Sequence, residues 1–147
     1  MMRYLLCELN DENYTDASFY FFYTLSMANN AAILDCVKNF DGNCEIETEN
    51  NGLRVTSRNG DSFYVIEIKE FDEDNGTHLL VWHHGYEGVD FEIRFQGTYE
   101  ECCKQREREI KELIDELELL NDDVNGNVVD TGNEWEVWDI VEIKECD

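Results

Sequence analysis

The sequence predicts an α+β fold, in which a mostly antiparallel sheet of about five to seven strands packs against a long amphipathic helix and one or two further helices. Three observations predict it. Apolar residues recur at helical spacing over residues 98–120. Polar and apolar residues alternate over much of residues 44–95, where Asn-Gly pairs interrupt them. The aromatic content of 12% is typical of a folded chain, and 147 residues are expected to form a single domain, 1–147.

The first part of the chain is predicted to contain one strand followed by helices. Residues 2–9 form an apolar run typical of a strand. Residues 17–27 include an aromatic run with strand propensity, but the flanking Ala, Leu and Met residues favour a helix. Asn30 is a suitable N-cap for a helix over residues 31–40, which Gly42 follows. The two helical segments are expected to form one bent helix or a helical hairpin.

The middle of the chain is predicted to be an antiparallel meander of about five strands. Asn51-Gly52 and Asn59-Gly60 are typical of the two-residue turns that join such strands. The expected strands are residues 44–49, 53–57, 62–71, 77–84 and 89–95.

The long helix has the clearest pattern in the chain. Thr98 can serve as its N-cap with Glu101 three residues later, which is the pattern of a capping box. On its outer face, acids and bases four residues apart stabilise the helix by a few tenths of a kcal/mol each. The predicted buried face consists of Cys103, Ile110, Leu113, Ile114, Leu117 and Leu120.

The segment after this helix is predicted to be a polar loop, 121–132, followed by a last strand, 134–145. The sequence VIEIKEFD of residues 65–72 returns nearly unchanged as IVEIKECD at residues 140–147. Eight residues are too few for a repeat unit, so we interpret the match as two similar strands.

The cysteines and the apolar runs indicate a soluble, cytoplasmic protein. The apolar run within residues 1–10 is too short for a signal peptide, and no stretch approaches the ~20 apolar residues of a membrane span. The cysteines form no C-x-x-C pair, so we expect them to be reduced and mostly buried, although their even number leaves disulfides open. They are Cys7, Cys36, Cys44, Cys102, Cys103 and Cys146.

Two segments suggest an alternative function, a small metal-dependent enzyme or a calcium-binding module. Residues 121–126 match the first half of an EF-hand loop, but Gly132 stands where the bidentate Glu is required. A second segment has three histidines around Trp82, and alternation places two of them on the face of Trp82 and the middle one opposite. No spacing provides the further ligands of a zinc site, so we predict no metal and no cofactor. The histidines are His78, His83 and His84.

The net charge is the strongest functional signal. The chain has 35 acids and 11 bases, a net charge of -24, and such self-repulsion opposes folding. Nucleic acid and anionic membranes are poor partners, because counterion release favours basic surfaces. Carboxylates two residues apart on a strand lie about 6.6 Å apart, so rows of them form a regular anionic surface. The predicted contact residues are Glu45, Glu47, Glu49, Asp90, Glu92, Glu112, Asp115, Glu116, Glu134 and Glu136.

In composition, size and acidic-strand pattern the chain resembles phage-encoded anti-defence proteins, such as DNA-mimicking anti-restriction and anti-CRISPR inhibitors. The resemblance implies a non-enzymatic inhibitor without catalytic residues. Its acidic surface would occupy the basic nucleic-acid-binding site of a nuclease or of a CRISPR- or restriction-type defence protein. The other interpretation is that the charge serves solubility alone. Candidate aromatic anchors for a partner are Trp82, Tyr86, Trp135 and Trp138.

Overall fold

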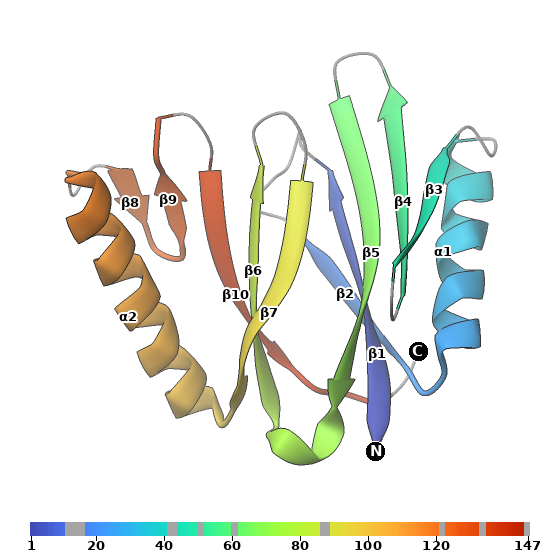
Figure 1. Cartoon of the computed structure of the whole chain (residues 1–147), viewed down its shortest axis with the longest axis horizontal. Coiled ribbons are helices and arrows are strands. Elements are labelled where there is room, and N and C mark those ends of the chain that lie inside the picture. Colours follow the sequence, from blue (N-terminus) through green and yellow to red (C-terminus); the bar gives the residue numbers. More distant parts are fainter. Residues whose placement is uncertain are drawn as a thin grey trace. The chain divides into compact units, whose positions relative to one another are not determined.

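The computed structural model of the chain (Figure 1) divides into two compact units. Unit 1 comprises Met1–Glu73 and Lys144–Asp147, and unit 2 comprises Asp74–Ile143. That the chain behaves as a single domain stays a prediction. The structure describes residues 1–10, 17–40, 44–49, 52–59, 62–85, 89–120, 123–132 and 135–145.

Unit 1 is a five-stranded antiparallel sheet with one helix against it. Its strands lie in the order β2-β1-β5-β4-β3, so that β2 and β3 are the edges. The long central pair, β1 and β5, runs in register from Met2 opposite Asp72 to Asn10 opposite Tyr64. Its elements are β1 (Met2–Asn10), β2 (Ser18–Phe22), α1 (Leu25–Phe40), β3 (Glu45–Glu49), β4 (Gly52–Asn59) and β5 (Ser62–Asp72).

Small side chains of α1 allow this helix to lie close to its sheet. Ala28, Ala32 and Cys36 are four residues apart, which places them on one face of the helix, and all three are buried. They pack in one apolar cluster with aliphatic residues of the sheet, among them Leu6 and Ile66. Helix and sheet in unit 1 therefore meet through an apolar layer.

Unit 2 is also a five-stranded antiparallel sheet with one helix. Its strands lie in the order β7-β6-β10-β9-β8, and a short 3-10 helix, η2 (Glu73–Asn75), precedes them in the chain. Its elements are β6 (His78–Gly85), β7 (Val89–Gly97), α2 (Tyr99–Leu117), β8 (Val124–Asn125), β9 (Val128–Asp130) and β10 (Trp135–Glu142).

The two units have the same topology, which the sequence analysis did not predict. Each consists of two strands, a helix and three strands, and in each the first strand pairs with the second and the last. The sequence echo fits this arrangement, because residues 65–72 end β5 and residues 140–142 end β10, the last strand of each unit. The similar strands thus occupy equivalent places in two like-folded units.

The predicted fold class is wrong in its arrangement of strands and helices. The chain forms two antiparallel five-stranded sheets, each with one helix, and not one sheet of five to seven strands against a long helix. Alternation shows which faces of a strand are buried, but it does not show which strand pairs with which. In this chain β5 pairs with β1 and β10 pairs with β6, so the predicted meander is divided between two sheets.

The helix predicted over residues 17–27 is also wrong in its first half. Ser18–Phe22 is strand β2, and Phe21 lies opposite Leu5 in the neighbouring β1. Pairing with β1 decides the structure of the aromatic run, because strand propensity depends on the neighbours available. A single helix, α1, then begins at Leu25 and includes the second predicted helical segment.

The long helix confirms its predicted start and part of its predicted buried face, because Ile110 and Leu113 pack against the apolar cluster of unit 2. The capping box of Thr98 and Glu101 is present. The helix ends at Leu117, three residues before the predicted end, and Leu117 and Leu120 are 46% and 71% exposed. Cys102 is fully buried, whereas Cys103 is only partly buried.

Other predicted segments differ in smaller ways. The polar loop 121–132 contains the hairpin of β8 and β9, whose turn includes Gly126 at a φ of 63°. Cys36 and Cys44 form a disulfide, so the prediction that the cysteines are reduced is wrong for this pair. Asn51 and Gly60, one residue of each predicted Asn-Gly turn, lie outside the described residues. No helix in the described part of the chain is both long and apolar enough to cross a membrane.

Candidate functional site

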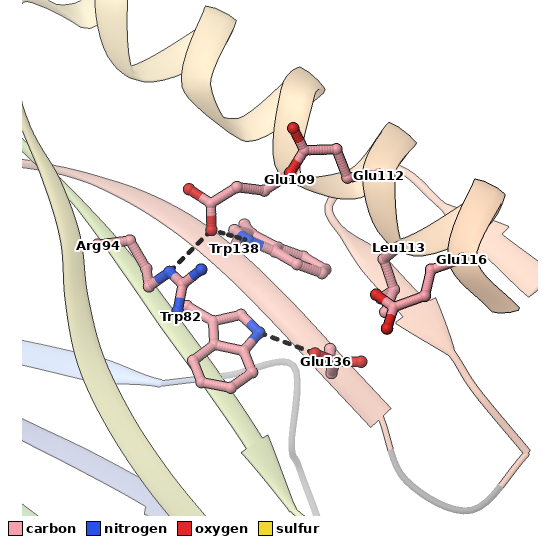
Figure 2. Close-up of a pocket in the computed structure, with 8 residues that line it drawn as sticks. All are labelled: Trp82, Arg94, Glu109, Glu112, Leu113, Glu116, Glu136 and Trp138. Atoms are coloured by element: carbon pink, nitrogen blue, oxygen red, sulfur yellow. Dashed lines mark hydrogen bonds and ion pairs between the residues drawn. The ribbon is translucent and has the colours of Figure 1, made fainter.

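A pocket of about 160 Å³ lies between α2 and the sheet of unit 2 (Figure 2). Four of its lining residues come from the helix and four from three adjacent strands, β7, β6 and β10. They are Glu109, Glu112, Leu113 and Glu116 from α2, Trp82 from β6, Arg94 from β7, and Glu136 and Trp138 from β10.

The two indoles lie side by side because of strand register. Trp82 of β6 is directly opposite Trp138 of β10, and alternation directs both side chains to the face that α2 covers. On the helix, Glu109, Leu113 and Glu116 follow one another at intervals of four and three residues, so they share one face. The pocket therefore has an indole floor and a largely acidic helical wall.

Arg94 reaches the pocket from an irregular position in β7. Leu80 lies opposite Phe95 and Val81 lies opposite Ile93, so Arg94 has no directly opposite residue in β6. This extra residue is typical of a β-bulge, which redirects a side chain relative to regular alternation. The sequence pattern alone did not reveal the bulge.

The guanidinium of Arg94 lies between an indole and a carboxylate (Figure 2). Its central carbon is 5.1 Å from the ring centroid of Trp82, within the range of a cation–π interaction. Its Nε donates to Oε1 of Glu109 at 2.8 Å, and its terminal nitrogen lies 3.4 Å from Oε2 of Glu92. Burial disfavours the charge of Arg94, but Glu109 and Glu92 outweigh it and raise the pKa of Arg94 above its usual value.

Glu109 joins the helix to both strands. The same oxygen that accepts from Arg94 also accepts from Nε1 of Trp138 at 3.4 Å. The side chain of Glu109 is only 9% exposed. Because a buried carboxylate needs such partners, these contacts fix the orientation of Glu109, Arg94 and Trp138 together.

Glu136 holds the second indole in place. Its Oε1 accepts from Nε1 of Trp82 at 3.2 Å, and the ring of His84 stacks on Trp82 with centroids 4.2 Å apart. Glu136 was predicted to lie in an exposed acidic row, but it is only 7% exposed. Its strand β10 lies inside the sheet, and the Glu136 side chain faces the layer beneath α2.

The other predicted contact residues are distributed over both units. Glu45 and Glu47 lie on edge strand β3 of unit 1, whereas Asp90 and Glu92 lie on edge strand β7 of unit 2. Glu49 belongs to β3, but its side chain lies outside the described residues, as does the whole of Glu134. The exposed members of the predicted set are Glu45, Glu47, Asp90, Glu92, Glu112, Asp115 and Glu116.

The structure brings only part of the predicted site together. Of the candidate aromatic anchors, Trp82 and Trp138 line the pocket, Trp135 contacts the ring of His83, and Tyr86 lies outside the described residues. Arg94 and Glu109 were not predicted from the sequence. Arg94 had one available signal, because it is the only base of residues 74–143 outside α2.

The histidine segment follows the predicted alternation. His84 stacks on Trp82, while His83 on the opposite face is fully buried and lies 2.8 Å from Oδ2 of Asp139. Asn127 donates to the other oxygen of Asp139 at 3.0 Å. Among the described residues, no group of three or more His, Cys, Asp or Glu side chains is arranged to hold a metal ion.

The segment that resembles an EF-hand loop has a different arrangement where it is described. Asp123, the third position of the predicted loop, accepts from the backbone amide of Leu120 at 3.0 Å through Oδ2. The fifth position, Asn125, belongs to strand β8. The first position, Asn121, lies outside the described residues.

Comparison of the chain with protein-family models, curated proteins and solved structures found no match. Its structure defines an acidic protein of two like-folded units, each with two strands, a helix and three strands. The pocket described above belongs to the second of these units.

Proposed function

We propose that the protein acts by binding, and that its exposed carboxylates occupy the basic nucleic-acid-binding site of a nuclease or of a CRISPR- or restriction-type defence protein. The observation on which this rests is the exposure of acids on α2 and β7 of one unit. Glu112, Asp115 and Glu116 are exposed on the helix, and Asp90 and Glu92 are exposed on the strand. A basic surface that binds phosphates would attract such an arrangement.

The charge of both units supports this proposal. Unit 2 has 19 acids and five bases, and unit 1 has 16 acids and six bases, which gives net charges of -14 and -10. Four of the five bases of unit 2 lie on α2. The fifth, Arg94, is paired with Glu109 and Glu92, so it adds little positive potential to the surface.

Acids at the end of α2 are unfavourable for the helix itself. The last turn of α2 includes Asp115 and Glu116 and has no basic residue. The C-terminal end of a helix has a partial negative charge, so acids there typically destabilise it by a few tenths of a kcal/mol or more. Helix stability therefore does not explain these two residues, whereas a role in binding a basic partner does.

Acids on the edge strands have a second explanation that needs a test. Charged side chains on β3 and β7 would also prevent these edges from pairing with other chains. This explanation, like solubility, predicts no specific partner. A pull-down from bacterial lysate at ~50 mM and ~300 mM salt separates the two, because salt weakens exposed charge interactions. We expect one nucleic-acid-handling protein that is lost at high salt and displaced by added DNA or RNA.

Matched variants then locate the contact surface. Asp90→Asn with Glu92→Gln tests unit 2, and Glu45→Gln with Glu47→Gln tests unit 1. Each double variant removes two charges. We expect at least one of the two variants to bind the captured partner about tenfold more weakly at low salt. The control is Glu107→Gln with Glu142→Gln, which removes two exposed acids outside the predicted set. Recovery of no specific protein at either salt would contradict the proposal.

A further inference from the structure

We propose that the pocket beneath α2 binds an organic cation, a guanidinium or alkylammonium group. This inference deepens the proposed function, because the cation would be a basic side chain of the partner or a free amine of the same chemistry. The pocket lies wholly within unit 2 and is lined by side chains of α2 and three strands. Figure 2 shows Arg94 and Glu109 meeting beside the two indoles, and Leu113 and Glu116 extending from α2 toward the sheet.

The size and floor of the pocket suit the alkyl part of such a ligand. Its volume is about 160 Å³, whereas one water molecule occupies about 30 Å³ of the liquid. Trp82, Trp138 and Leu113 provide apolar surface. Trp138 is 3% exposed and held by Glu109, so its indole is a rigid surface. The methylene groups of a Lys or Arg side chain pack well on surfaces of this kind.

The charge of the lining selects a cation. Four carboxylates and one guanidinium line the pocket, and Arg94 is already paired with Glu109. The carboxylates of Glu112 and Glu116 are exposed at the pocket, and Glu136 accepts from Trp82, so the lining has a net negative charge and an anion would be repelled. A neutral apolar ligand would take water from these carboxylates without replacing its hydrogen bonds. A guanidinium or ammonium group provides both charge and donors.

Arg94 shows that these walls can hold a guanidinium. It lies over the Trp82 ring and donates to a carboxylate of α2, which are the two contacts proposed for the ligand. The chain thus already uses an indole and a helical glutamate to bind one organic cation. We infer that Glu112 and Glu116, the next acids along the same helix, bind a second one in the pocket that Trp82 and Trp138 help to line.

Unit 1 is an internal comparison, because it has the same topology as unit 2. At the corresponding layer, where α1 covers the first and last strands of its sheet, the side chains are Leu6, Ile66 and Ile68. In unit 2, the first and last strands instead place Trp82 and Trp138 beneath α2. The acidic, indole-lined layer is therefore a feature of unit 2 and not of the fold.

The direct test uses the whole protein and small cations alone. Ethylguanidinium and propylammonium are titrated while tryptophan fluorescence and heat are recorded, with propylurea and propionate as neutral and anionic probes. We expect one site for each cation with a Kd of about 1 mM, as suits a fragment of this size. No binding up to about 50 mM, or equally tight binding of propylurea, would overturn the inference.

Matched helix variants locate this binding. Glu112→Gln with Glu116→Gln removes two pocket carboxylates at exposed positions where the fold tolerates change. Glu100→Gln with Glu107→Gln removes the same charge from exposed positions of the same helix that neither line the pocket nor belong to the predicted contact set. We expect the first pair to raise the Kd of the cation probes at least about fivefold, and the second pair to raise it less than about twofold. Equal weakening by both pairs would overturn the inference.

The source of the cation is decided by the captured partner. If the Glu112→Gln and Glu116→Gln variant loses the partner and the control pair keeps it, the cation is a basic side chain of that partner. If the probes bind at the pocket but no partner is captured, the site stands, the proposed function fails, and a free amine is the ligand. If a partner is captured but no probe binds, the proposed function stands and the pocket inference fails.

Discussion

The side chain of Thr98 accepts a hydrogen bond from one of the first backbone amides of α2. The hydroxyl of Thr98 accepts from the amide of Glu101 at 3.2 Å, and Oε1 of Glu101 accepts from the amide of Thr98 at 3.0 Å. The first amides of a helix lack acceptors within it. We expect Thr98→Ala to lower the free energy of unfolding by about 1 kcal/mol, measured by urea denaturation.

The control for this prediction is Thr98→Ser, which keeps the accepting oxygen. It should change the free energy of unfolding by only a few tenths of a kcal/mol. If Ser and Ala lower the stability equally, the loss comes from the methyl group of Thr98 and not from the cap.

Adjacent cysteines in α2 are predicted to react at different rates. Burial raises the pKa of the Cys102 thiol, and the thiolate is the form that reacts with alkylating reagents. A raised pKa means less thiolate at any pH below it, so Cys102 should react more slowly than the partly exposed Cys103 at pH ~8. Timed treatment with iodoacetamide followed by peptide mass spectrometry measures both sites. In urea the two rates should become similar, and a difference that persists there would contradict the explanation.

At the scale of elements, the sequence predicted those parts whose signals are local. The start of α2 was predicted because Thr98 and Glu101 form a pattern within four residues. β2 was not, because its aromatic residues become a strand only through pairing with β1. The division into two sheets was not predicted for the same reason, because it also depends on which strands pair.

The candidate site was predictable to a similar extent. The sequence singled out five residues that line the pocket, which are Trp82, Glu112, Glu116, Glu136 and Trp138. It missed Arg94, because a bulge changes the direction of the side chain without any change in the local pattern of residue types. It missed Glu109 because an acid on a helix gives no indication of which strand it meets.

The disulfide between Cys36 of α1 and Cys44, the residue before β3, is predicted to stabilise the fold of unit 1. Cys36 and Cys44 are eight residues apart, and Cys36 is buried in the cluster between helix and sheet. Closing a loop of this length lowers the entropy of the unfolded chain, which corresponds to about 2–3 kcal/mol. We expect a reductant to lower the free energy of unfolding by this amount in urea denaturation. The double variant Cys36→Ser with Cys44→Ser should be less stable and insensitive to the reductant, and equal sensitivity would contradict the prediction.

At the scale of the whole molecule, folding and binding are expected to respond to salt in opposite directions. The net charge of -24 repels itself in the folded state, and the distance over which charges interact falls from about 30 Å at 0.01 M salt to about 10 Å at 0.1 M. Added NaCl should therefore raise Tm, by about 2–4 °C for each kcal/mol of repulsion that is screened. The same screening should weaken the binding of a basic partner. Conditions that favour the fold therefore disfavour the complex.

Neutral substitutions test whether the exposed acids cause this behaviour. The variant with Glu45→Gln, Glu47→Gln, Asp90→Asn and Glu92→Gln has four charges fewer on edge strands β3 and β7. At low salt we expect its Tm to exceed that of the natural chain, because repulsion is reduced, and the difference should shrink as NaCl is added. Differential scanning calorimetry over a series of NaCl concentrations measures both quantities. A Tm that is lower at every salt concentration would mean that these carboxylates stabilise the sheets, and the acidic edges would then need no partner to explain them.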